Sequence, residues 1–253
     1  MRLKGKVALI TGASRGIGAE VARQMSSEGA SVYLTAHDSE EALAQVADEC
    51  NERNPEGKAR FGSFDFLDEA APAAAVDAAM SALGRIDILV NNAAIRVRRP
   101  FGEYSSEDFN NMIAVNLRAP FHLGQAVVPI MKAAGSGRII NIASQMGSIA
   151  EQNLAIYGLT KAALIHLTMS MAFELAPSNI MVNAVSPGPT MTEYNEERTR
   201  QNPEYLAHKL SFLRTGRYSR PDEIAEAVLF LASTAATNIQ GHNLVVDGGY
   251  LIQ

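Results

Sequence analysis

Residues 7–18 read VALITGASRGIG, and this stretch decides the fold that we expect for the 253-residue chain. A short apolar stretch, residues 7–11, leads directly into a turn with glycines at positions 12, 16 and 18. Such glycines let backbone amides approach a pyrophosphate, which then lies at the N-terminus of the following helix. The turn therefore predicts a dinucleotide site, and the alternative is a tight strand-to-helix turn that binds nothing.

Strand-like and helix-like segments alternate outward from this turn. Further apolar strands are expected at residues 31–35, 59–64, 86–90, 138–142, 180–184 and 244–246. Helices are expected at residues 16–28, 38–53, 67–83, 107–132 (kinked at Pro120), 155–176 and 221–233. Apolar strands joined by crossover helices form a parallel sheet with both faces covered. The predicted fold class is therefore α/β, with one doubly wound, Rossmann-type domain spanning residues 1–253.

One long segment departs from this alternation. Residues 187–220 are polar and contain Pro187, Pro189 and Pro203. A long insertion after the carboxyl end of a strand lies beside the crevice in which open α/β sheets bind their ligands. We therefore expect residues 188–216 to form a substrate lid.

The composition argues against several other classes of protein. The formal net charge is −5, so no general basic surface for nucleic acid or an anionic membrane is expected. A single cysteine, Cys50, excludes an intramolecular disulfide and suits a reducing compartment. The apolar runs are too short for a membrane helix, and the five histidines are scattered. We therefore expect a cytoplasmic protein without a metal site.

A series of short motifs follows the glycine turn in order. These are Asp65, Asn91-Asn92-Ala93-Ala94, Asn116, Ser144, Tyr157-Gly158-Leu159-Thr160-Lys161, Pro187-Gly188 and Asp247-Gly248-Gly249. Together with Thr11 to Gly18, the series resembles the short-chain dehydrogenase/reductase family over essentially the whole chain. Ala94 stands where the family usually has glycine. The resemblance implies a nicotinamide cofactor and an oxidoreductase activity on a secondary alcohol or ketone.

Tyr157 and Lys161 are four residues apart on one predicted helix, so their side chains share a face. A nearby ammonium group favours the phenolate of a tyrosine, whose ordinary pKa is about 10. The resemblance gives Tyr157 the acid/base role, Lys161 a second role on the nicotinamide ribose, and Ser144 the polarisation of the reacting oxygen. It also implies that Asn116 orders a water linking Lys161 to solvent; a capping or packing role is the alternative for Asn116.

The resemblance also places the cofactor. The residues expected to contact its phosphates and nicotinamide are Gly12, Ser14, Arg15, Gly16, Ile17, Gly18, Asn92, Tyr157, Lys161, Pro187, Gly188, Thr190 and Thr192. The residues expected near its adenosine are His37, Asp65 and Phe66. Ala36 occupies the position of the family's NAD-selecting acid, whereas Arg15 can pair with a 2′-phosphate. NADP(H) is therefore favoured over NAD(H), unless Asp38 turns into the pocket and restores a preference for NAD.

Three of the four residues 96–99 are arginines, in a chain that is acidic overall. Arginine suits a carboxylate, and Arg98, with residues 191–194 and 202–204, resembles the gluconate 5-dehydrogenase group. Near the predicted catalytic serine and tyrosine, Gln145, Glu151 and Gln152 add polar groups that suit a polyol or a sugar acid. The alternatives are a 3-oxoacyl-thioester reductase, which the glycine turn also resembles, a steroid or terpene alcohol dehydrogenase, and a catalytically idle NADP sensor or scaffold.

The two longest predicted helices, residues 107–132 and 155–176, are apolar on more than one face. A helix that is apolar all round must be buried on both sides. We therefore expect these helices to pack against symmetry mates in a homotetramer, which the resemblance also implies. The other expected partner is a small-molecule substrate, and we expect neither nucleic acid nor a membrane.

Overall fold

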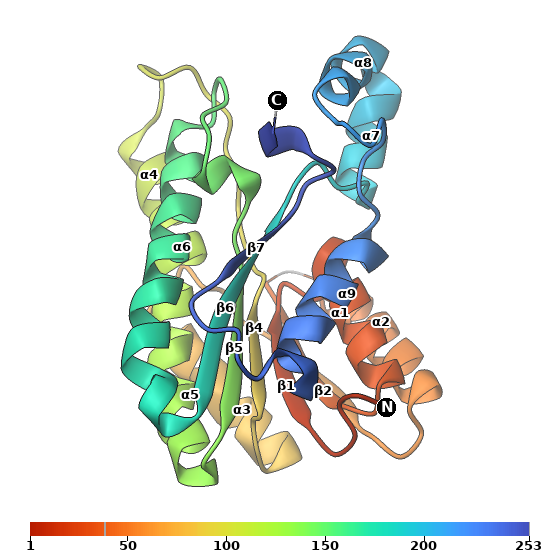
Figure 1. Cartoon of the computed structure of the whole chain (residues 1–253), viewed down its shortest axis with the longest axis vertical. Coiled ribbons are helices and arrows are strands. Elements are labelled where there is room, and N and C mark those ends of the chain that lie inside the picture. Colours follow the sequence, from red (N-terminus) through yellow and green to blue (C-terminus); the bar gives the residue numbers. More distant parts are fainter. Residues whose placement is uncertain (38, 253) are drawn as a thin grey trace.

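A seven-stranded sheet forms the centre of the computed structural model, which describes residues 1–37 and 39–252 (Figure 1). The strands are β1 (Val7–Thr11), β2 (Ser31–Ala36), β3 (Ala59–Ser63), β4 (Ile88–Asn91), β5 (Gly137–Ile142), β6 (Ile180–Pro187) and β7 (Asn243–Val246). Their order across the sheet is β3-β2-β1-β4-β5-β6-β7, and each neighbouring pair is parallel. The predicted α/β fold with a doubly wound parallel sheet is confirmed.

Helices cover both faces of the sheet (Figure 1). Their bounds are α1 (Gly16–Ser27), α2 (Glu40–Arg53), α3 (Ala71–Leu83), α4 (Ser106–Ile113), α5 (Ala119–Ala134), α6 (Ala155–Leu175), α7 (Glu193–Gln201), α8 (Pro203–Ser211) and α9 (Pro221–Ala232). Helices α1, α2 and α9 lie on one face, and α3, α5 and α6 on the other (Figure 1). Helices α7 and α8 extend beyond the carboxyl ends of the strands, within the segment that was expected to form a lid. Within the described residues, none of the helices has the length and apolar character needed to cross a membrane.

The core has two apolar layers, one on each face of the sheet. Successive side chains of a strand point to opposite faces. In β1, Ala8 and Ile10 therefore join the layer under α1 and α9, while Leu9 joins the layer under α3 and α5. All three are 0% exposed, and full burial of a leucine or isoleucine side chain stabilises the fold by about 1.5–3 kcal/mol.

The strand order reverses direction at β1, and this reversal locates the site. β1 pairs with β2 on one side and with β4 on the other, so Ile10 lies between Leu34 and Val90. Helices connected from the two sides cover opposite faces and leave a crevice at the carboxyl ends of β1 and β4. The glycine turn that follows β1 opens into this crevice.

The expected helix over residues 107–132 is interrupted. It consists of α4 and α5 with a π-helical stretch, Ala114–Arg118, between them. Pro120, at the start of α5, has no backbone N–H, and its ring excludes the carbonyl group four residues earlier. The N–H of Ala119 correspondingly bonds to the carbonyl of Ala114, five residues back. The irregularity thus precedes Pro120 and widens the helix at Asn116.

Other predicted boundaries shift by one to four residues; strand β6, for example, ends at Pro187 rather than residue 184. Helix α3 begins at Ala71 rather than residue 67, because the carboxylates of Asp65 and Asp68 accept the N–H groups of Leu67 and Ala70 in a turn. Strand β4 begins at Ile88 rather than residue 86. Side-chain hydrogen bonds such as those of Asp65 and Asp68 compete with the hydrogen bonds of a helix, and the hydrophobic pattern of the sequence does not reveal them.

Candidate active site

The glycine turn is packed too closely for larger residues. A Cβ at Gly18 would lie 2.3 Å from the carbonyl oxygen of Gly12, and a Cβ at Gly12 would lie 2.8 Å from the Cα of Ala93. Asn92 fastens the turn to the end of β4, because its Nδ2 donates to the carbonyl oxygens of Thr11 and Gly12 at 2.9 Å each. The predicted cofactor residue Asn92 therefore holds the turn in place and also lines the cavity.

The N-terminus of α1 is suited to bind an anion. Arg15 occupies the N-cap position without a capping side-chain bond, and the first turn of α1 contains no acidic residue. The first amide groups of a helix have no partner within the helix and attract phosphate. Ser14, Gly16 and Ile17 belong to the same turn, so these residues fit the pyrophosphate of a dinucleotide.

The other predicted adenosine residues lie at the ends of β2 and β3. Ala36 ends β2, and the imidazole of His37 lies 3.7 Å from the carboxylate of Asp65. The side chain of Phe66 is buried in the core, which leaves Asp65 as the exposed polar group of the predicted adenine pair. Asp38, the residue on which the alternative preference for NAD depends, lies outside the described residues.

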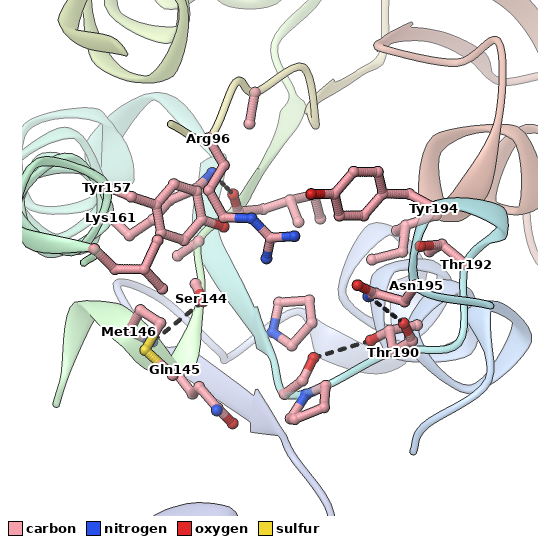
Figure 2. Close-up of a pocket in the computed structure, with 18 of the residues that line it drawn as sticks. Arg96, Ser144, Gln145, Met146, Tyr157, Lys161, Thr190, Thr192, Tyr194 and Asn195 are labelled. Carbon is pink, nitrogen blue, oxygen red and sulfur yellow. Dashed lines mark hydrogen bonds between the residues drawn. The ribbon is translucent and has the colours of Figure 1, made fainter. Parts of the chain in front are cut away.

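Ser144, Tyr157 and Lys161 meet at one end of a cavity of about 590 Å³ (Figure 2). Ser144 follows β5, and its hydroxyl accepts the N–H of Met146 at 3.1 Å. Tyr157 and Lys161 lie one turn apart on α6, with the Lys161 Nζ 5.7 Å from the centre of the tyrosine ring. The predicted shared helix face is therefore present.

Burial controls the ionisation of the two α6 residues. Desolvation raises the pKa of Tyr157, while the Arg96 guanidinium and a bond to Ser144 lower it less. Desolvation also lowers the pKa of Lys161 to about 8, although its Nζ donates to the carbonyl oxygen of Ile142 at 2.7 Å. Both shifts favour the neutral forms, so without a cofactor burial outweighs the expected stabilisation of the phenolate.

Asn116 is fully buried in the π-helical stretch. Its side chain accepts the N–H of Ile95 at 2.8 Å and donates to the carbonyl of Ile95 at 2.9 Å. Its Nδ2 also lies 3.2 Å from the Thr160 hydroxyl. The Asn116 side chain thus fastens the loop after β4 to α6 and uses both N–H groups of its amide, while Oδ1 can accept one further bond. The proposed water relay remains a prediction.

The structure brings most of the predicted site residues to this cavity. Those that line it are Arg15, Ile17, Asn92, Arg98, Ser144, Gln145, Tyr157, Lys161, Pro187, Gly188, Thr190 and Thr192. Gln152 does not belong to the lining and is exposed, so the structure does not support its predicted contact with the substrate. Within the described residues, no group of three histidine, cysteine, aspartate or glutamate side chains is arranged to hold a metal ion.

Charged and aromatic side chains line the end of the cavity beyond Tyr157, and one of them, Lys209, was not singled out from the sequence. Arg96 extends between the rings of Tyr157 and Tyr194, 5.9 and 5.4 Å from their centres (Figure 2). Glu151 accepts from the predicted substrate residue Arg98 at 2.9 Å and from Lys209 of α8 at 2.5 Å. Residues of the lid segment therefore complete the wall of the cavity.

The chain is similar to known proteins over almost its whole length. A family model described as enoyl-(acyl carrier protein) reductase matches residues 12–251. D-threitol dehydrogenase of Mycolicibacterium smegmatis is 39% identical, covering 100% of this chain and 95% of that protein. Gluconate 5-dehydrogenase of Gluconobacter oxydans is 36% identical, and the match covers 99% of this chain and 96% of that protein. A short-chain dehydrogenase of Burkholderia cenocepacia in complex with NADP superposes with a TM-score of 0.92 at 32% identity, covering 99% and 100%.

Proposed function

The chain belongs to the short-chain dehydrogenase/reductase family of NAD(P)-dependent oxidoreductases acting on CH–OH groups, and we propose that it acts on a sugar acid with NADP(H). The observation that carries this proposal is the charge of the cavity. Of the described residues that line it, five are basic (Arg15, Arg96, Arg98, Lys161 and Lys209) and one, Glu151, is acidic. In a chain of net charge −5, a cavity of this kind concentrates anions.

Each catalytic side chain has a task set by its chemistry. A bound nicotinamide supplies the hydride for reduction of a ketone and accepts it in oxidation of an alcohol. The Ser144 hydroxyl donates a hydrogen bond to the reacting oxygen and polarises it. Tyr157 donates its proton to that oxygen in the reduction and removes the proton in the oxidation. The Lys161 ammonium would favour the phenolate of Tyr157, and the positive charge of an oxidised nicotinamide would add to that effect.

The polar wall beyond Tyr157 suits a polyhydroxylated acid. Arg98 donates one N–H to Glu151, and its buried Nε–H has no hydrogen-bond partner among the described residues. Gln145 lies on the cavity wall with a buried amide oxygen that likewise has no partner in the described part of the chain. We propose that Arg98 binds the carboxylate of the substrate and that Gln145 accepts one of its hydroxyl groups. A steroid would leave these polar groups unpaired at a high desolvation cost.

The preference for NADP(H) depends on Arg15. Arg15 is exposed at the mouth of the cavity, and Ala36 brings no carboxylate to the end of β2. Replacing Arg15 with alanine removes a charged contact to the 2′-phosphate, worth about 1.5–3 kcal/mol. We expect Arg15→Ala to weaken NADPH binding by about 10- to 150-fold and NADH binding far less, as measured by fluorescence titration.

The complementary variant is Ala36→Asp. A carboxylate at the end of β2 repels a 2′-phosphate and can bond the ribose hydroxyls of NADH, so this variant should move selectivity towards NADH. Equal affinity of the unmodified protein for the two cofactors would overturn the assigned role of Arg15.

We propose a homotetramer for the assembled protein. Large apolar side chains on α4, α5 and α6 are exposed: Phe109 is 44% exposed, Phe121 43%, Leu159 52%, Met169 45% and Phe173 86%. Large apolar side chains exposed on neighbouring helices are typical of surfaces that bind another protein chain. A two-fold axis that pairs the helices of two copies would bury the patch on both.

Light scattering at micromolar concentration should therefore give the mass of four 27.1 kDa chains. Phe173→Asp should give a smaller assembly, because a charge would enter the buried interface. The mass of a single chain for the unmodified protein would contradict the proposal.

A spectrophotometric screen of NADP⁺ and NADPH turnover tests the proposed function. We expect activity with sugar acids above that with neutral polyols, and little with 3-oxoacyl thioesters. Faster reduction of a thioester would instead favour the alternative of a 3-oxoacyl-thioester reductase. Cofactor binding without turnover of any substrate would instead indicate a sensor, although the intact Ser144, Tyr157 and Lys161 set argues for an enzyme.

A further inference from the structure

Three charged side chains from separate segments form one buried chain of ion pairs. Arg98 comes from the loop after β4, Glu151 from the loop before α6, and Lys209 from α8 in the lid segment. The Arg98 Nη2 lies 2.9 Å from one Glu151 oxygen, and the Lys209 Nζ lies 2.5 Å from the other. Their side chains are 24%, 18% and 7% exposed, so solvent screens the charges poorly. We call these residues the ionic triad.

The ionic triad carries an unbalanced positive charge. Burial alone would raise the pKa of Glu151, but Lys209 and Arg98 hold that pKa below its ordinary value. Glu151 therefore stays ionised, and the three groups sum to one net positive charge. A buried charge without a counter-charge is unfavourable, and Glu151 is the only acidic residue among the described residues that line the cavity. A ligand with one negative charge would neutralise the ionic triad.

The ionic triad also joins the lid segment to the body of the protein. Lys209 belongs to α8, whereas Arg98 and Glu151 lie in the segments that follow strands β4 and β5 of the main sheet. The anion subsite therefore has both of its cations only while α8 lies against the loop that contains Glu151. A neutral ligand would fill the same space but would gain nothing from the charge of Lys209.

We propose that Lys209 and Glu151 are specificity-determining residues: Lys209 joins Arg98 in binding a single carboxylate of the substrate, and Glu151 spaces the two cations and limits the subsite to one negative charge. This rests on the proposed function, because it assigns the acid selectivity of the same cavity to the lid segment. The substrate class that fits is a monoanionic polyhydroxy acid, rather than a neutral polyol of equal length.

The test compares D-gluconate with D-glucitol, which share a six-carbon chain and differ in the carboxylate. Dissociation constants are measured by calorimetry on protein saturated with NADPH, which cannot oxidise either ligand. The unmodified protein should bind D-gluconate at least about tenfold more tightly. Lys209→Met keeps the length of the side chain and removes its charge. It should weaken D-gluconate binding about 10- to 100-fold and leave D-glucitol binding within about threefold.

Two further variants separate charge from structure. Glu151→Gln keeps the shape and raises the net charge of the subsite by one, so the preference for D-gluconate over D-glucitol should rise rather than fall. Lys209→Arg should restore most of the preference that Lys209→Met loses. Arg99→Met is the matched control, because Arg99 pairs with Asp108 and does not line the cavity, so it should leave the preference unchanged.

The outcomes distinguish this inference from the proposed function. Equal affinity of the unmodified protein for the two ligands would overturn the inference, as would equal weakening of both ligands by Lys209→Met. A fall in preference for Glu151→Gln would overturn the assigned role of Glu151. These results come from binding alone, so they stand whether or not the protein oxidises D-gluconate. An absence of turnover with every sugar acid, together with the expected binding ratios, would count against the proposed reaction only.

Discussion

Replacing Tyr157 with phenylalanine is expected to reduce turnover by about 10²- to 10⁴-fold while leaving the fold and cofactor binding nearly unchanged. Only the hydroxyl is lost, and the ring keeps its packing against the buried cluster that contains Met146 and Leu154. A positioned acid/base group contributes an effect of this size because the reacting oxygen must gain or lose a proton in the transition state. Steady-state rates of NADPH oxidation, measured where chemistry limits turnover, give the result.

Tyr194→Phe is the matched control for this experiment. Tyr194 lines the same cavity and contacts the same Arg96 guanidinium, but it lies on the lid segment, across the cavity from Ser144 and Lys161 (Figure 2). We expect this variant to keep most of the activity. If Tyr157→Phe retained more than about a tenth of the unmodified rate, the assignment of Tyr157 as the acid/base would be wrong.

Lys161→Met is expected to lower turnover by about 100-fold or more, because Tyr157 loses its nearest ammonium group. The same variant should change how stability depends on pH. Burial lowers the pKa of Lys161 to about 8 from an ordinary value of about 10.5. Between these values the unfolded chain binds a proton that the folded chain does not, so the unfolding free energy of the unmodified protein rises with pH.

The size of this change follows from the pKa difference. One pKa unit corresponds to about 1.4 kcal/mol. As the pH rises from about 8 to 10.5, the unfolding free energy of the unmodified protein should therefore increase by roughly 3 kcal/mol relative to that of Lys161→Met. Urea unfolding of both proteins at fixed concentration across this range gives the difference. A difference that stays constant with pH would show that the Lys161 pKa is close to its ordinary value in the folded protein.

The sequence was sufficient to predict the sheet and the proximity of Tyr157 to Lys161 because both depend on local patterns. Residues 7–18 contain a buried strand and the glycines that its turn requires, and the structure shows why no side chain fits at Gly12 or Gly18. Tyr157 and Lys161 share a helix face through their spacing alone. Alternating apolar segments then predicted a parallel sheet covered on both faces, since crossover helices leave few other arrangements.

The substrate end of the cavity was harder to predict because its residues come from distant segments. Glu151 and Lys209 are 58 positions apart, and a lysine in a polar helix ordinarily faces solvent. The sequence identified Arg98 by the surplus of arginines near it, but it gave no sign that Glu151 accepts a bond from Arg98. The exposure of Gln152 was missed for the same reason, because proximity to Tyr157 in sequence does not set the direction of a loop side chain.

The π-helical stretch around Asn116 was not predictable from periodicity either. A proline within a helical pattern indicates an irregularity, but not whether the helix bends or widens. In the structure the widening places the Asn116 side chain against the backbone of Ile95, and so it fixes the loop that carries Arg96 and Arg98. A helical irregularity thus positions the cations of the proposed substrate site.

Our central claim is that Tyr157, assisted by Ser144 and Lys161, transfers the proton in an NADP(H)-dependent hydride exchange on a sugar acid. The most direct measurement is the ratio of kcat/KM for D-gluconate to that for D-glucitol, with NADP⁺ and with NAD⁺ as the cofactor. We expect the ratio to exceed about ten and the NADP⁺ rates to exceed the NAD⁺ rates. A ratio at or below one would contradict the sugar-acid assignment, and equal or higher rates with NAD⁺ would contradict the cofactor assignment.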